Sequence, residues 1–335
     1  MDHIKVLKRA FEITWRYRVL WVFGIILALT TGGGGGGGGN GRFQYTFGGE
    51  ELSGFPMNTL ITIGVGLACV IVILIIASVV ARYVAETALL RMVDDHEETG
   101  EQRSVRQGFR LGWSRTALRL FLMNLLIGLP TAVVFILLFA LALAPLLLWA
   151  TESRVAGVIG TVATIGLVFL VILLLIIVAT ILSLLMHFFR RACALEELGV
   201  IESIQHGYAF VRRHLKDVVI MWLIMVGLGL GWIFVMIPVA ILLLVVAAIL
   251  GGFPALLVGG LASLVFEGPV PQILAAAVGI PIFILVVAVP GLFLGGLKEV
   301  FKSSAWTLTY RELRALEGME AEPEQLPELD TPDLE

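Results

Sequence analysis

Six stretches of this chain are long, apolar and almost free of charge, and they restrict the possible fold more than any other feature. We place them at about 19–31, 59–82, 117–150, 155–186, 218–250 and 270–297. Runs of 18 or more apolar residues are candidates to cross a bilayer as helices. Of all residues, 59% are apolar and 15% are charged, whereas about 25% are charged in a typical soluble domain. The sequence therefore predicts an all-α polytopic membrane protein with six transmembrane helices.

The basic residues indicate how these helices are oriented. Of the 23 lysines and arginines, 21 lie before the first stretch, between the second and third, between the fourth and fifth, or after the sixth, if Arg82 and Arg119 at the facing ends of the second and third stretches are counted with the connection between them. The other three connections contain only Arg42 and Arg154. Because cytoplasmic loops carry the excess of lysine and arginine, we expect a multi-pass protein with both termini in the cytoplasm.

Three short segments, 7–18, 104–116 and 204–216, resemble one another. Superposing the small residues Ala10, Gly108 and Gly207 also aligns the aromatic residues Phe11, Phe109 and Tyr208, at spacings of 98 and 99 residues. Chance similarity among amphipathic helices is the alternative interpretation. Because two apolar stretches follow each copy, the pattern favours three parallel repeats at about 1–98, 99–199 and 200–316 within a single membrane domain, 1–316. The remainder, 317–335, is rich in acidic residues and proline and is expected to be a disordered cytoplasmic tail.

The middle segment shows why these copies are expected to lie on the membrane surface. Wound as a helix, it places Val105, Phe109 and Trp113 on one side and arginines on the other, which is typical of an interfacial amphipathic helix. Ser104 and Gln107 have the spacing of a capping box. The candidate contacts for anionic lipid or a partner are Arg9, Arg16, Arg106, Arg110, Arg212, Arg213, Phe109, Trp113 and Tyr208.

The connections predict further local structure. Eight glycines at 32–39 indicate a flexible external loop, because glycine loses the most backbone entropy on ordering. The apolar connection 251–268 is interrupted by glycine and proline, so it could form a re-entrant or interfacial element. On the inner side, the even-numbered spans are expected to continue as helices over 81–91, 188–198 and 300–316. Gly199 would end the second of these, and Ser203 would cap the next helix.

Chemically reactive patterns are scarce in this sequence. The centres of the predicted spans hold no ionisable residue, and the histidines lack the spacing of metal ligands. We therefore expect no metal, no cofactor, no enzymatic activity and no nucleic-acid partner. Asn124 is expected to form a hydrogen bond between helices rather than a ligand contact. Close helix packing is expected at two GxxxG pairs, Gly227 with Gly231 and Gly291 with Gly295.

Two longer stretches, RACALEELGVIESIQHGYAFVRRHLKDVVIMWLI at 191–224 and VFKSSAWTLTYRELRA at 300–315, carry a family resemblance. Together with the glycine-rich loop, they resemble uncharacterised prokaryotic six-span membrane proteins related to the membrane domain of glycerophosphoryl diester phosphodiesterases. This resemblance implies the same topology in a prokaryotic plasma membrane. The catalytic barrel of those enzymes is absent from this chain, so neither their activity nor their catalytic residues are expected here.

Three classes of function are compatible with this sequence. The first is a non-enzymatic membrane scaffold or accessory subunit whose basic interfacial helices contact the anionic inner leaflet, a membrane protein partner or a second copy of the chain. The second is a transporter or permease for an apolar or lipid-like solute, and the third is a membrane-embedded enzyme. The first is favoured, because the span centres lack charge and the distinctive residues gather at the inner surface.

Overall fold

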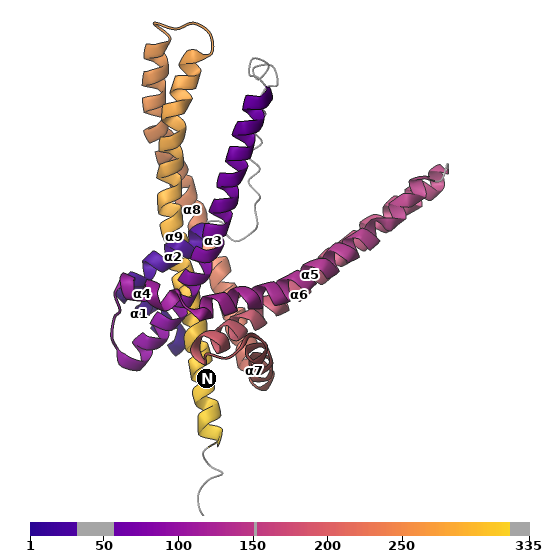
Figure 1. Ribbon diagram of the computed structural model, residues 1–335, viewed down its shortest axis with the longest axis vertical. Helices are drawn as coiled ribbons and strands as arrows, with labels where there is room; N and C mark the ends of the chain where they lie inside the picture. Colours follow the sequence, from indigo (N-terminus) through magenta and orange to yellow (C-terminus); the bar gives the residue numbers. More distant parts are fainter. Residues whose placement is uncertain (32–56, 151–152, 322–335) are drawn as a thin grey trace, which may run out of the picture. The chain divides into compact units, whose positions relative to one another are not determined.

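The computed structural model describes residues 1–31, 57–150 and 153–321, and within these ranges every regular element is a helix (Figure 1). The glycine run 32–39 and residues 322–335 of the predicted tail 317–335 lie outside the described residues. The start of that tail was predicted wrongly, because α9 continues as a helix to Ala321. The elements are α1 (His3–Arg16), α2 (Val19–Thr30), α3 (Met57–Thr99), α4 (Val105–Gly112), α5 (Arg115–Leu143), the 3₁₀ helix η2 (Ala144–Ala150), α6 (Arg154–Leu195), α7 (Val200–Arg213), α8 (Leu215–Ala262) and α9 (Val270–Ala321).

Five helices, α3, α5 with η2, α6, α8 and α9, are long and apolar enough to cross a membrane. A sixth span is obtained only if α1 and α2, which are bent by 98°, are counted as one broken span. Helix α2 has 12 residues, or about 18 Å at 1.5 Å per residue, which is shorter than the ~30 Å hydrocarbon core. Most side chains of the long apolar helices are exposed, as expected for a membrane-embedded protein.

The chain divides into two compact units. The first unit comprises Met1–Val6, Trp113–Trp222 and Trp306–Glu335, and the second comprises Leu7–Gly112 and Leu223–Ala305. In the first unit, α5 and α6 lie side by side as a hairpin (Figure 1), and α7 packs against α6.

The predicted third span, 117–150, is not one continuous α-helix. Helix α5 ends at Leu143, and the remaining residues form η2, which packs back on α6. The indole of Trp149 lies over Gly157 and its Nε1 donates a hydrogen bond to Thr161 Oγ1 at 2.9 Å. Pro145 has no N–H and cannot donate the next α-helical hydrogen bond. The change from α-helix to 3₁₀ helix falls beside this residue.

Glycine permits the closest helix contacts of the second unit. Helices α2 and α9 cross at Gly24 and Gly296, where a Cβ on Gly296 would lie 2.8 Å from the backbone nitrogen of Ile25. Helices α8 and α9 approach at Gly251 and Gly279, where a Cβ on Gly251 would lie 2.9 Å from the carbonyl oxygen of Gly279. At both contacts, glycine lets the two helix backbones approach closely.

The connection 251–268 forms no re-entrant break, and an interfacial position of this segment stays a prediction. Helix α8 continues through Gly251 and Pro254 to Ala262, and only the short turn before Val270 is non-helical. Glycine at 251 allows the helix to pack against α9 instead of breaking it. Gly268 adopts a positive φ of 80° in the turn, which glycine does without steric cost.

The boundary between α6 and α7 also differs from its prediction. Helix α6 ends at Leu195, and Glu197, not Gly199, takes the left-handed conformation with φ of 55°. Gly199 is the N-cap of α7, and its N–H donates to Glu202 Oε2 at 3.1 Å. Ser203 therefore lies inside the first turn, where its hydroxyl donates to the Gly199 carbonyl at 2.7 Å.

The predicted helix 104–116 is correct at its start and wrong at its end. The capping box is confirmed, because Ser104 N–H donates to Gln107 Oε1 at 2.9 Å and Gln107 N–H donates to Ser104 Oγ at 3.4 Å. The helix ends at Gly112, and the chain bends through Ser114, which is extended, before α5 begins. The bend separates a short amphipathic helix from a long apolar one.

Candidate membrane-surface site

Three short helices, α1, α4 and α7, carry the predicted lipid or partner contacts. In each, the small residue of the aligned motif is buried, namely Ala10, Gly108 and Gly207. The aromatic residue that follows it is exposed in each: Phe11 by 61%, Phe109 by 40% and Tyr208 by 55%. Each short helix therefore places a small residue against the protein and an aromatic residue outward.

Two of the buried small residues, Gly108 and Gly207, lie where their helices meet a long helix. In the second unit, α4 packs on α3, and a Cβ on Gly108 would clash with Met92 Sδ and with the Phe23 ring. In the first unit, α7 packs on α6, and a Cβ on Gly207 would lie 2.6 Å from the Phe189 ring. Only glycine leaves room for these approaches.

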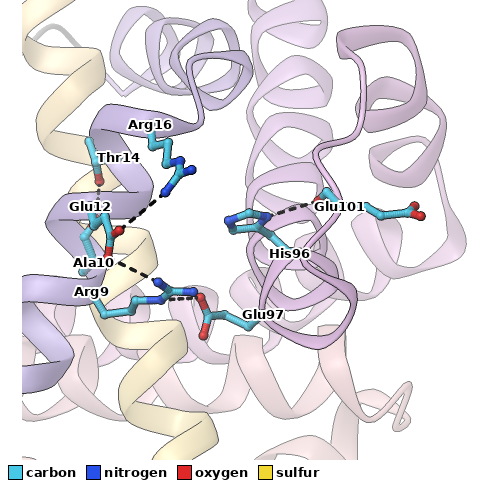
Figure 2. A network of polar contacts seen from close by, with 8 residues as sticks. All are labelled: Arg9, Ala10, Glu12, Thr14, Arg16, His96, Glu97 and Glu101. Atoms are coloured by element: carbon cyan, nitrogen blue, oxygen red, sulfur yellow. Dashed lines mark hydrogen bonds and ion pairs between the residues drawn. The ribbon is translucent and has the colours of Figure 1, made fainter.

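Three of the six predicted arginines form ion pairs within the chain. Arg9 Nε lies 2.9 Å from Glu97 Oε1, and Arg9 Nη1 lies 3.2 Å from Glu12 Oε2, which links α1 to the end of α3 (Figure 2). Arg16 approaches the same Glu12 at 3.9 Å. In the first unit, Arg213 lies 3.5 Å from Glu317. Pairs this exposed contribute only about 0–1 kcal/mol each.

The other three, Arg106, Arg110 and Arg212, project from α4 and α7 and are exposed. Within the described part of the chain, no ion pair involves any of them. Trp113, which follows α4 in the sequence, is 73% exposed. Arg106 and Arg110 on α4 of the second unit, and Arg212 on α7 of the first unit, can each accept an anionic group from outside the chain.

Residues at the end of α3 make several polar contacts with neighbouring groups of the second unit. Arg103 Nε lies 2.8 Å from Asp95 Oδ2, and the Tyr17 hydroxyl donates to the Arg103 carbonyl at 2.9 Å. The His96 ring contacts the Glu101 carbonyl at 3.1 Å (Figure 2). These contacts were not predicted from the sequence, although the alternation of acidic residues with nearby arginines was a usable signal.

A second polar cluster, which the sequence interpretation missed, surrounds Glu196 in the first unit. Its carboxylate is 13% exposed and accepts a hydrogen bond from the Tyr310 hydroxyl at 2.5 Å. His206 Nδ1 and Arg314 Nε approach it at 3.5 and 3.6 Å. Tyr310 lies on the charged end of α9, beyond the apolar stretch 270–297. Burial is the main cause that raises the pKa of Tyr310, and the carboxylate of Glu196 raises it further. The phenol therefore keeps its proton and acts as the donor. The Glu196 cluster joins α6, α7 and α9.

The residues predicted for helix packing have different surroundings. Asn124 Oδ1 accepts a hydrogen bond from Arg190 Nη2 at 3.3 Å, which joins α5 to α6. Gly295 is buried. A Cβ built on Gly227, Gly231 or Gly291 would meet no described atom within 4 Å, so the close helix approaches lie at other glycines.

Comparison with known proteins gives a family but no function. The model of DUF7544, described as a family of unknown function, matches residues 2–304. No curated protein matches the chain, and no solved structure does. The resemblance to the membrane domain of glycerophosphoryl diester phosphodiesterases therefore stays a prediction. Because the match covers most of the 335 residues, the chain belongs to the DUF7544 family.

Proposed function

We propose that this protein is a non-enzymatic scaffold or accessory subunit of a prokaryotic plasma membrane. Both termini lie in the cytoplasm, and α1, α4 and α7 lie on the inner membrane surface, where they bind anionic lipid or a partner protein. The observation that carries the proposal is the burial pattern of the three short helices, in which the aligned small residue is buried and the aromatic residue after it is exposed.

The same pattern supports an organisation in three parallel repeats. Each short helix is followed by two further helices, α1 by α2 and α3, α4 by α5 and α6, and α7 by α8 and α9. Each repeat therefore contributes one surface helix and one hairpin to a single membrane domain, 1–316. With α2 counted as a span, three hairpins return the chain to the same side each time, so the surface helices share one membrane face.

Charge supports an anionic partner on that face. Arg106, Arg110 and Arg212 are exposed, and a basic residue near an anionic membrane surface contributes about 1 kcal/mol of binding free energy. Three such residues together correspond to about a hundredfold in affinity. The effect should weaken with added salt, because exposed charges are screened.

The test compares lipid selectivity in the native chain and in the triple variant Arg106→Gln, Arg110→Gln, Arg212→Gln. Each protein is purified in mild detergent and titrated with phosphatidylglycerol and phosphatidylcholine, and bound lipid is counted by native mass spectrometry. We expect the triple variant to lose at least tenfold in its preference for phosphatidylglycerol. Arg154→Gln, which removes an exposed charge at the opposite end of α6, is the matched control and should keep the preference.

If the triple variant keeps its preference for phosphatidylglycerol, anionic lipid is excluded as the partner of these helices. Transport is tested separately, by reconstituting the native chain in liposomes with fluorescent lipid analogues. A scaffold leaves the rate of analogue movement at the level of empty liposomes. An increase in that rate would replace the scaffold with the transporter or permease.

A further inference from the structure

Helix α1 has two apolar faces, and only one of them packs against the protein. Val6, Ala10 and Ile13 are exposed by 3%, 0% and 2%. Ile4, Phe11 and Trp15 are exposed by 66%, 61% and 61%. At 3.6 residues per turn the second set shares one face, roughly opposite the first. A helix buried on one face thus presents large apolar side chains on the other.

The exposed face of α1 continues onto the apolar helices of the same unit. The rings of Phe11 and Trp15 stack with centroids 6.4 Å apart, and Trp15 meets Trp21 of α2 at 6.2 Å. Trp21 in turn meets Phe293 of α9 at 5.4 Å. Its Nε1 donates to the Thr14 carbonyl at 2.7 Å, which fixes the indole at the bend. We call Phe11, Trp15, Trp21 and Phe293 the aromatic row.

The bend and the flanking charges place this row at the edge of a bilayer. Helix α1 makes an angle of 98° with α2, so α1 lies parallel to the membrane plane when the apolar α2 points into it. Lys5, Lys8 and Arg16 are exposed on α1. The guanidinium of Arg18 lies 5.9 Å from the centre of the Trp21 ring. Tryptophan beside basic residues is typical of the level of the lipid headgroups.

We propose that the aromatic row is a phospholipid-binding surface that inserts into the leaflet on the basic side of the membrane. Phe11 and Trp15 lie among the upper acyl chains, and Arg16 and Arg18 bind the headgroup phosphates. The row thereby sets the depth of α1 and anchors a helix pair whose apolar part, α2, is too short to cross the hydrocarbon by itself. This inference rests on the proposed function only in placing α1 at the membrane surface.

Spin labels measure this depth directly. Single cysteines replace Phe11, Trp15 and, as the exposed control on the charged side of α1, Lys5, in a chain carrying Cys69→Ser and Cys193→Ala. The labelled proteins are reconstituted in phosphatidylglycerol and phosphatidylethanolamine, and collision rates with oxygen and with a water-soluble nickel chelate are compared. At positions 11 and 15 we expect the oxygen rate to exceed the nickel rate, and at position 5 the reverse.

Two results overturn the inference. Nickel rates at 11 and 15 as high as at 5 mean that the face is in water, and low rates for both reagents mean that protein, such as a second copy, covers it. The proposed function is tested separately by the arginine triple variant. If that variant loses its preference for phosphatidylglycerol, the proposed function stands even when either of these two results rules out the inference about α1. If the cysteine-free background fails to fold, the native chain is compared with its Trp15→Phe variant. The difference between their tryptophan fluorescence is the emission of Trp15. Brominated phospholipid must quench this emission, and acrylamide must not.

Discussion

At the scale of single residues, the Glu196 cluster shows how one side chain joins three helices. One carboxylate oxygen accepts from Tyr310 and lies near Arg314, and the other faces His206. A carboxylate that is mostly out of water is stable only when donors surround it. Removing one donor therefore costs more than the bond alone contributes, because the remaining groups keep their desolvation penalty.

Tyr310→Phe deletes only the hydroxyl that donates to Glu196. We expect the free energy of unfolding to fall by about 1–3 kcal/mol, measured by denaturant titration in detergent micelles. Tyr208→Phe is the control, because Tyr208 is 55% exposed, and it should change stability by no more than about 0.5 kcal/mol. If the two substitutions lowered the free energy of unfolding equally, the hydrogen bond from Tyr310 to Glu196 would not contribute more to stability than an exposed hydroxyl does.

Residues at helix starts could be predicted better than residues in tertiary clusters. The capping box of Ser104 and Gln107 depends only on local spacing, and it was predicted correctly. Gly199 and Ser203 were assigned wrongly, because Glu197 takes the left-handed position that glycine usually occupies. The bond between Glu196 and Tyr310 joins residues 114 positions apart, and no local pattern indicates it.

At the scale of helices, glycine has two different roles in this chain. Gly24 and Gly296 allow α2 and α9 to cross, whereas Gly227, Gly231 and Gly291 face open space. The GxxxG spacing identifies glycines on one helix face, but it does not say whether another helix lies there. The amphipathic short helices were predictable because their charge pattern is internal to each segment.

The crossing of α2 and α9 gives a prediction with an internal control. In Gly296→Ala the new Cβ would lie 2.8 Å from the backbone nitrogen of Ile25, so we expect a loss of about 1–3 kcal/mol from overpacking. In Gly291→Ala nothing lies within 4 Å of the Cβ, and the better helix propensity of alanine should leave stability unchanged or raise it by up to ~1 kcal/mol. Thermal unfolding of both variants in the same detergent measures the difference. If Gly296→Ala left the stability unchanged, the close crossing of α2 and α9 would be contradicted.

The longest helices are longer than a bilayer requires. Helix α8 has 48 residues, or about 72 Å, against ~30 Å of hydrocarbon. Even a tilt of about 40°, the upper end of the usual range, accommodates only about 39 Å of helix within that thickness. A part of α8 must therefore lie outside the hydrocarbon. The sequence boundary at residue 250 placed the end of this helix too early, because glycine and proline at 251–254 were taken as a break.

At the scale of the whole molecule, the number of spans decides on which membrane face each short helix lies. The apolar helices could be recognised from composition alone, because 59% apolar residues leave no soluble alternative. The count of five or six could not, because α2 is short and bent by 98° from α1. If α2 does not reach the far side, α1 lies on the opposite membrane face from α4 and α7.

The most direct test labels single cysteines with a membrane-impermeant maleimide in right-side-out and inside-out vesicles. Lys5, Arg106 and Arg212 are replaced in turn as markers of α1, α4 and α7, and Arg154 marks the opposite end of α6. We expect cysteines at 5, 106 and 212 to react only in inside-out vesicles and the cysteine at 154 to react only in right-side-out vesicles. A cysteine at 5 that reacts together with the one at 154 would contradict a shared face for the three surface helices.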